Sequence, residues 1–245
     1  MSPFSPETSV RDVLRAAPQA LAVFERHRLD YARAGAQPLA VACRTAGLDV
    51  GHVLADLEEA RVAPVSSPPA LPPQTLDVRA LVELVLGTHH AVTRRAIETL
   101  PALAAKVATV HGGATPELRR VRELVEALFH ELAAHIGREE QMLFPYLVAL
   151  CDAEERGTRR PRPPFETAAR PIHVMRMDHD AAGALLAELA EVTNGYILPA
   201  GACSSWRALY EGLEAHNQDL MRHVWIENEL LFPKALELEQ RLDAR

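Results

Sequence analysis

The 245-residue sequence has few cysteines, few aromatic residues and no long apolar run. Its three cysteines, Cys43, Cys151 and Cys203, are too few and too scattered for a disulfide framework or a cysteine-only metal site. The longest apolar run, around Ala80 to Leu86, is far shorter than the ~20 residues that a membrane helix needs. Any metal site must therefore use histidine and carboxylate, and we expect no membrane segment.

The N-terminus lacks the basic and apolar regions of a secretory signal, so we expect a cytoplasmic protein. The formal net charge is -7, from 26 Lys and Arg against 33 Asp and Glu. The one short basic stretch, Arg159 to Arg162, is interpreted as a solvated loop. The negative charge argues against nucleic acid as a partner.

Alanine, leucine, glutamate and arginine are plentiful, and apolar residues recur with a spacing near 3.6, which predicts an all-α fold. Five prolines between Ala63 and Gln74 predict a linker at residues 63–76. Residues 1–62 are expected to form a small N-terminal helical domain. Its short helices are predicted at Val10 to Ala17, Gln19 to His27, Pro38 to Ala46 and Val50 to Arg61.

Residues 77–245 are expected to form an antiparallel four-helix bundle. The helical stretches are long enough to cross a small bundle and are separated by segments rich in glycine or proline. They run from about Asp77 to Val110, Pro116 to Leu150, Pro171 to Asn194 and Cys203 to Leu238.

The two halves of this bundle carry the same motif. His135-Ile-Gly-Arg-Glu139 is followed by Leu143-Phe144-Pro145, and His223-Val-Trp-Ile-Glu227 is followed by Leu231-Phe232-Pro233 at identical offsets, 88 residues later. The Leu-Phe-Pro tails are interpreted as structural. Their apolar pairs are expected to fill the bundle end, and their prolines to kink or restart the helix.

A further histidine precedes each motif by about one helix. His90 lies 45 residues before His135, and His179 lies 44 residues before His223. Periodicity alone does not decide between His89 and His90. The remaining histidines fall outside the pattern and are interpreted as surface, cap or polar core residues: His27, His52, His111, His130, His173 and His216.

The spacing of the motifs indicates a metal site. A His and a Glu four residues apart lie about 6 Å apart on one helix face. Two such pairs and two further histidines supply four imidazoles and two carboxylates, which suits two cations with two bridging glutamates and two terminal histidines each. Iron, manganese and zinc all accept this thiolate-free set, and the carboxylate bridges favour iron. The predicted ligands are His90, His135, Glu139, His179, His223 and Glu227.

Acidic residues near these ligands are candidate hydrogen-bond partners or proton relays. Glu131 lies one turn before His135 on the same face, and Asp178 and Asp180 flank His179. Each of them also suits a solvated position on a helix surface.

The motifs resemble those of hemerythrin-like (HHE) cation-binding domains, and nearly the full chain is similar to the iron–sulfur cluster repair di-iron proteins, the RIC family. The resemblance implies a non-haem di-iron centre, with or without an oxo bridge, and it selects His90 over His89. Oxygen-carrying hemerythrins use an additional histidine near the third-helix ligand, where this chain has Ala181, Ala182 and Gly183. The resemblance therefore implies a more open site than that of an oxygen carrier.

Residues Val23 to Tyr31 resemble the short helical domain that precedes the bundle in this family. The family usually continues with two adjacent cysteines and two glycines, whereas this chain has Ala32-Arg33-Ala34-Gly35. Alanine and arginine neither ligate iron nor exchange disulfides, so a cysteine-dependent step is not carried over to these positions. Cys43 is interpreted as a packing residue.

The resemblance implies repair of iron–sulfur clusters damaged by nitrosative or oxidative stress, by iron supply or by binding or reducing nitric oxide. The expected partners are NO or O2 and client iron–sulfur proteins, and an enzymatic activity of the nitric oxide reductase type stays open. One alternative is a non-enzymatic oxygen, redox or NO sensor or carrier. Another is a metal-free helical scaffold with buried His–Glu hydrogen bonds.

Overall fold

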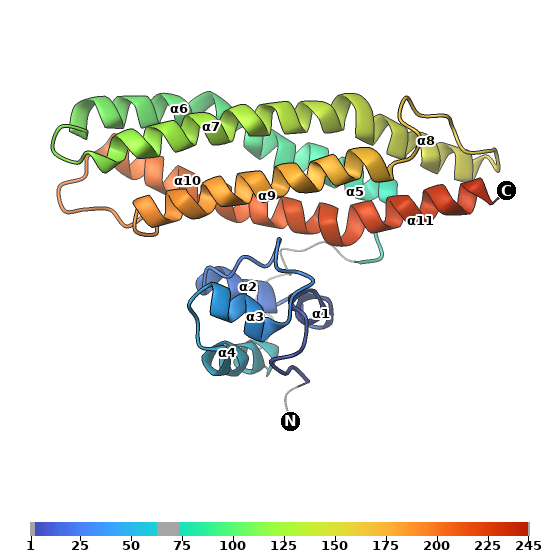
Figure 1. Ribbon diagram of the computed structural model, residues 1–245, viewed down its shortest axis with the longest axis horizontal. Coiled ribbons are helices and arrows are strands. Elements are labelled where there is room, and N and C mark those ends of the chain that lie inside the picture. The colour runs from blue at the N-terminus through green and yellow to red at the C-terminus, as the bar shows by residue number, and fades with distance from the viewer. Residues whose placement is uncertain (1–2, 63–73, 245) are drawn as a thin grey trace. The chain divides into compact units, whose positions relative to one another are not determined.

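The computed structural model describes residues 3–62 and 74–244 (Figure 1). These residues form helices and no strand, and they contain one isolated bridge between Ser9 and Pro38. The all-α fold predicted from the sequence is confirmed. Residues 63–73 of the predicted linker, with its five prolines, lie outside the described residues.

The chain divides into two compact units. The first unit contains residues 1–77 and the segment Met221–Pro233. The second contains Val78–Leu220 and Lys234–Arg245.

The first unit contains short helices close to the predicted ranges: α1 (Val10–Ala16), α2 (Ala20–Arg26), α3 (Leu39–Thr45) and α4 (Val50–Val62). Ser9 caps α1, because its hydroxyl accepts a hydrogen bond from the Asp12 N–H at 3.2 Å. The buried rings of Phe24 and Tyr31 stack in the core with centroids 6.4 Å apart. Cys43 is fully buried, which fits the packing role expected of it.

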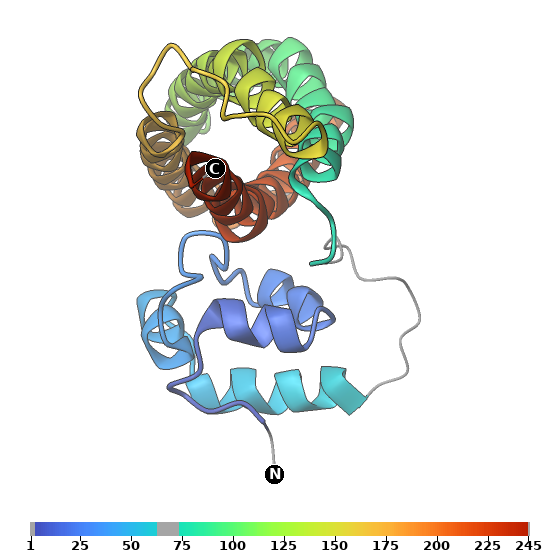
Figure 2. The ribbon, with the colours of Figure 1, turned by 90° about the vertical axis from the view of Figure 1, so that its right-hand side faces the viewer.

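The chain from Val78 onward forms long helical rods, which Figure 1 shows side by side and Figure 2 shows end-on. Their segment Met221–Pro233 is the one grouped with the first unit. The elements along the chain are α5 (Val78–Leu84), η1 (Val85–His90), α6 (Ala91–His111), α7 (Glu117–Arg138), η2 (Glu139–Leu143), α8 (Phe144–Glu155), α9 (Ala169–Val192), α10 (Ser204–Ile226), η3 (Glu227–Leu231) and α11 (Phe232–Asp243). Elements that follow one another without a break form one rod. The prefix η marks a π-helical turn.

The rods pack as expected for an antiparallel bundle. α6 lies against α7, α7 lies against α9, and α5 at the start of the first rod lies against α8 at the end of the second. The buried apolar residues of α7 lie one, three or four positions apart, so that one face of this helix enters the core: Leu118, Val121, Leu124, Val125, Leu128, Phe129, Leu132 and Ile136. After α8, Gly157 has a φ of 63°, a left-handed conformation that glycine adopts without strain.

Candidate metal centre

The structure brings the six predicted ligands together from the four rods. His90 is the last residue of η1, and Glu139 and Glu227 are the first residues of η2 and η3. The other three histidines lie within regular helices, in α7, α9 and α10: His135, His179 and His223. All six side chains are buried, with exposed fractions between 0% and 4%.

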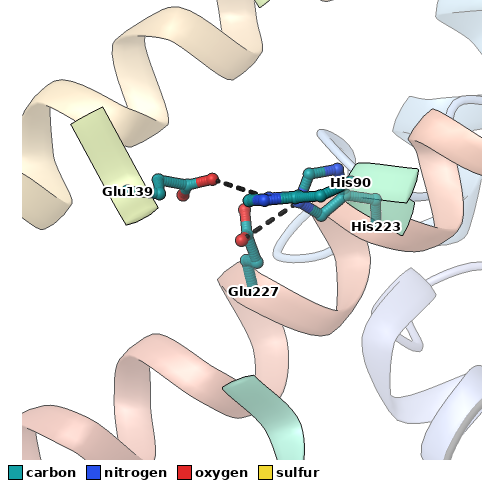
Figure 3. A group of neighbouring side chains, drawn as sticks. All are labelled: His90, Glu139, His223 and Glu227. Atoms are coloured by element: carbon teal, nitrogen blue, oxygen red, sulfur yellow. Dashed lines mark ion pairs between the residues drawn. The ribbon is translucent and has the colours of Figure 1, made fainter. Parts of the chain in front are cut away.

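The six side chains form two groups, each with four donor atoms within 4.8 Å of one another. The first group is His90, Glu139, His223 and Glu227, and Figure 3 shows these side chains directed toward one another. The second group is His135, Glu139, His179 and Glu227. Both glutamates belong to both groups, whereas each histidine belongs to one. This is the partition expected for two cations bridged by two carboxylates.

The distances inside the groups suit donors that share a cation. The Nε2 atoms of His90 and His135 lie 3.2 Å and 3.3 Å from Oε2 of Glu139. Nε2 of His223 lies 3.1 Å from Oε1 of Glu227. Two ligands bound at about 2.1 Å and at right angles on one cation are about 3 Å apart. The donor set and its spacing therefore fit a pair of divalent cations.

Three of the six ligands sit at π-helical turns, which the sequence analysis did not predict. In two of these turns the N–H of Phe144 bonds to the carbonyl of Glu139, and the N–H of Phe232 bonds to the carbonyl of Glu227. Both bonds span five residues instead of four. Turns of this kind are rare and are concentrated at functional sites.

A Phe-Pro tail follows two of these π turns, η2 and η3, and no proline follows η1 directly. Pro145 and Pro233 each lie two residues after the last residue of the widened turn. Proline lacks an N–H for the helix ladder, and its ring would clash with a carbonyl one turn earlier, so a wider turn accommodates it. The helix continues beyond both prolines, so the tail lies within its rod and not at the bundle end. The side chains of Phe144 and Phe232 are buried there, as expected.

Two of the ligand histidines contact a carboxylate through Nδ1, the ring nitrogen that does not face the donor groups. Nδ1 of His90 lies 2.7 Å from Oε1 of Glu140, which is paired with Arg94. Nδ1 of His135 lies 3.3 Å from Oδ2 of Asp178. Such contacts fix the imidazole tautomer and turn Nε2 toward the metal position.

Asp178 is thus the outer carboxylate that the sequence predicted. The hydrogen bond from His135 lowers the pKa of Asp178, and Arg138 at 2.7 Å acts in the same direction against the opposing effect of burial. Glu131 and Asp180, proposed for the same role, are exposed. Glu140 is a hydrogen-bond partner that the sequence does not predict, because its only signal there is its place beside Glu139.

The other histidines have different surroundings. His89 is buried, and its Nδ1 lies 3.0 Å from Asp219, so it does not join either donor group. His216 is buried against the ring of Phe129, with centroids 5.0 Å apart, and is a polar core residue. His27 pairs with Asp56 at 2.7 Å in the first unit.

Residues 84–235 match the family model described as the hemerythrin HHE cation binding domain. The chain belongs to this hemerythrin HHE family. In the other part of the chain, residues 6–61 match a second model, ScdA_N, described as a domain of unknown function. The two matches flank the predicted linker, and the boundaries at residues 62 and 77 stay a prediction.

Two relatives of this hemerythrin-family chain carry the same name. The iron–sulfur cluster repair protein YtfE of Yersinia pseudotuberculosis serotype IB (strain PB1/+) is 34% identical over 224 residues, which are 91% of this chain and 94% of the relative. The YtfE protein of Yersinia pestis (strain Pestoides F) matches with the same identity and coverage. The resemblance drawn from the motifs is thereby confirmed.

The hemerythrin-family match agrees with the expected two-metal cofactor, because the matched domain binds cations and the structure holds two adjoining His/Glu groups. At the two positions that this chain has in place of the family's usual paired cysteines, Ala32 is buried and Arg33 is exposed and paired with Asp30. No described helix has both the length and the apolar character that crossing a membrane requires.

Proposed function

We propose that this protein repairs damaged iron–sulfur clusters and that its six buried ligands hold a pair of iron ions for this purpose. The observation that carries the proposal is the sharing of Glu139 and Glu227 by two adjoining donor groups. The cation-binding family and the name of the relatives support it. The proposed ligands are His90, His135, Glu139, His179, His223 and Glu227.

Each ligand has a defined role in this proposal. Glu139 and Glu227 would hold both cations, because each of them belongs to both buried donor groups, and the cations would supply positive charge beside these two buried carboxyl groups. Glu140 and Asp178 accept the Nδ1–H of His90 and His135 and so orient these imidazoles. When bound, a reduced pair of non-haem irons supplies electrons and open coordination positions for NO or O2.

Iron is also the cargo in this proposal. A client protein that has lost iron from its cluster presents cysteine thiolates, which are strong ligands for iron. The imidazole and carboxylate donors of this chain give up ferrous iron to such thiolates without any change of oxidation state. The location expected from the sequence, the cytoplasm, is part of the same proposal.

Iron analysis of protein purified without added metal tests the proposal first, and two iron ions per chain are expected from the two donor groups. The reduced protein is then mixed anaerobically with an apo iron–sulfur protein and inorganic sulfide, and the rebuilt cluster is measured by its absorbance and by the recovered client activity. Nitrous oxide is measured on the same preparation after addition of NO.

The outcomes separate the candidate functions. Cluster recovery with loss of iron from this protein supports repair by iron supply. Nitrous oxide formation with iron retained supports repair through NO removal. Protein without iron, or iron-loaded protein that shows neither reaction, contradicts the proposal. If the iron-loaded protein shows neither reaction, it is tested for binding to a partner protein. Binding that changes with the metal state would support the alternative function as a sensor.

A further inference from the structure

Thr93 of α6 carries a hydroxyl group that has no hydrogen-bond partner among the residues that the structure describes. The residue is only 1% exposed. Two other threonines of the same helix, Thr99 and Thr109, each donate their hydroxyl to the carbonyl four residues earlier, at 2.8 Å. Thr93 does not bond back to its own helix in this way. Because burying a hydroxyl without a partner is costly, Thr93 marks a position where a bound molecule can supply the missing contact.

Thr93 lies one helical turn from the candidate metal centre. It follows the ligand His90 by three residues, and both side chains are buried. Three residues of helix rise about 4.5 Å and return a side chain to nearly the same face. On α9, the buried residue Ala182 has the same offset from the ligand His179. Both residues therefore lie on the side of the centre that the chain reaches after these two ligands.

Two buried leucines lie at the same level on the other two rods. Since neighbouring rods run in opposite directions, three residues after the ligand in α6 and α9 correspond to three residues before the ligand in α7 and α10. The four residues at this level are Thr93, Leu132, Ala182 and Leu220. Thr93 is the one polar side chain of the four, and Ala182 is the smallest.

The two shared carboxylates reach the centre from the opposite side. Glu139 and Glu227 follow the ligand histidines of their own rods by four residues, so they lie away from Leu132 and Leu220. The six ligands therefore leave the side of Thr93 free of carboxylates. Coordination positions that the protein does not fill face this side.

We propose that Thr93 is a ligand-binding residue, whose hydroxyl donates a hydrogen bond to a small molecule bound at the metal pair. This inference rests on the proposed function, because it assigns a binding residue to the open positions of the same centre. The ligand class is a small anion or a diatomic molecule that carries an acceptor atom next to the metal. The side chains of Leu132 and Leu220 have no polar group, so the Thr93 hydroxyl is the donor at this level.

Azide binding tests the inference. Azide is a small anion with acceptor nitrogen atoms, and its binding to the oxidised, iron-loaded protein is followed by absorbance. Thr93→Val should raise the Kd for azide by about 10-fold, because it removes one hydrogen bond to a charged ligand and keeps the shape of the side chain. Thr93→Ser keeps the hydroxyl and should bind azide with a Kd within about twofold of the wild-type value.

Thermal unfolding separates ligand binding from a structural role. Thr193 is the matched control, because its buried hydroxyl donates to the Leu189 carbonyl at 2.6 Å and accepts from the Tyr196 N–H at 3.0 Å. Thr193→Val should lower the unfolding midpoint and leave the Kd for azide unchanged. Thr93→Val should leave the midpoint unchanged or raise it, because it breaks no hydrogen bond within the described part of the protein.

A second pair of variants tests the side on which the ligand binds. Ala182→Val adds two methyl groups at the level of Thr93 and should weaken azide binding while both iron ions are retained. Ala181→Val, at an exposed position of the same helix, is the control and should bind azide like the wild-type protein.

The outcomes that overturn the inference are all read on iron-loaded protein. They are failure of the wild-type protein to bind azide, and a Kd that Thr93→Val or Ala182→Val leaves unchanged. Loss of iron from the Thr93→Val variant would also overturn it, because Thr93 would then support the metal ligands. Absence of iron from the wild-type protein would instead contradict the proposed function, so the two failures are distinguishable.

Discussion

Arg222 and Glu25 lie 197 positions apart in the chain and form a two-point ion pair. The guanidinium donates from Nε to Oε1 at 2.7 Å and from Nη2 to Oε2 at 2.9 Å. Arg222 directly precedes the proposed ligand His223. Arg11 and Arg15 make similar contacts to the buried Glu229, two residues beyond Glu227, at 3.4 Å and 3.7 Å. Charged groups from the start of the chain thus contact residues that lie one and two positions from these ligands in the sequence.

Glu25→Gln is expected to lower the free energy of unfolding by about 1 to 2 kcal/mol, because it removes the charge from a pair that is mostly shielded from water. It should also speed iron release, since Arg222 adjoins His223 in the chain. Chemical denaturation and chelator kinetics measure the two effects. Glu58→Gln, in an exposed pair with Arg61, is the control and should alter neither. Unchanged release kinetics would show that the pair stabilises the fold without influencing the ligand.

Glu139→Ala is expected to remove both iron ions together, because the carboxylate belongs to both donor groups. Glu140→Gln, one residue further on, should keep both ions, because Glu140 belongs to neither donor group. It should lower the affinity of the protein for iron by about 10- to 100-fold, because Glu140 orients the ligand His90. Iron content after gel filtration distinguishes the two variants. Retention of one tightly bound ion by the Glu139→Ala variant would contradict the bridging role.

Glu239→Ala is expected to destabilise the second unit by about 2 to 4 kcal/mol. The Glu239 carboxylate is buried and accepts hydrogen bonds from the Tyr146 hydroxyl at 2.5 Å, from Arg160 at 2.9 Å and from the Ala168 N–H at 3.0 Å. Its removal leaves these donors without their acceptor at the start of α9. Thermal unfolding measures the loss, and Glu237→Ala on the exposed face of α11 should have little effect.

The stability of the first unit should fall at alkaline pH. Burial raises the pKa of Tyr31 well above its ordinary value of 10.0, and the neighbouring Glu25 adds to this. Below that ordinary value both the folded and the unfolded chain keep the phenol proton, so the contribution to stability is complete. Above it the unfolded chain loses the proton first, and stability decreases as the pH rises.

Tyr31→Phe tests this dependence, because phenylalanine has no phenol to ionise. Unfolding midpoints of both proteins are measured between about pH 8 and pH 11. The wild-type midpoint should decline more steeply than that of the variant at the alkaline end. Parallel curves for the two proteins would show that Tyr31 is not responsible.

Much of the fold follows from local pattern. The spacing of apolar residues and the placement of glycine and proline predict helices that agree with those of the structure within a few residues at most ends. The repeated His-x3-Glu motif likewise predicts which side chains share a helix face. These features depend on residues close together in the chain, so the sequence states them directly.

Other features depend on how the helices rotate and shift against each other. The sequence could not show that His89 lies at Asp219 while its neighbour His90 reaches Glu140, because both contacts cross between rods. The π turns at Glu139 and Glu227 were also missed, since a helical pattern of 3.6 residues does not reveal where one turn widens.

The sequence by itself determined an all-α chain with six candidate ligands and their division into His-x3-Glu pairs and single histidines. Only the tertiary structure decided that Glu139 and Glu227 serve both donor groups and that His90 and His135 have outer carboxylates at different distances. The physical reason is that one helix fixes the spacing of its own side chains. The distance between side chains on different helices is set by packing of the whole core.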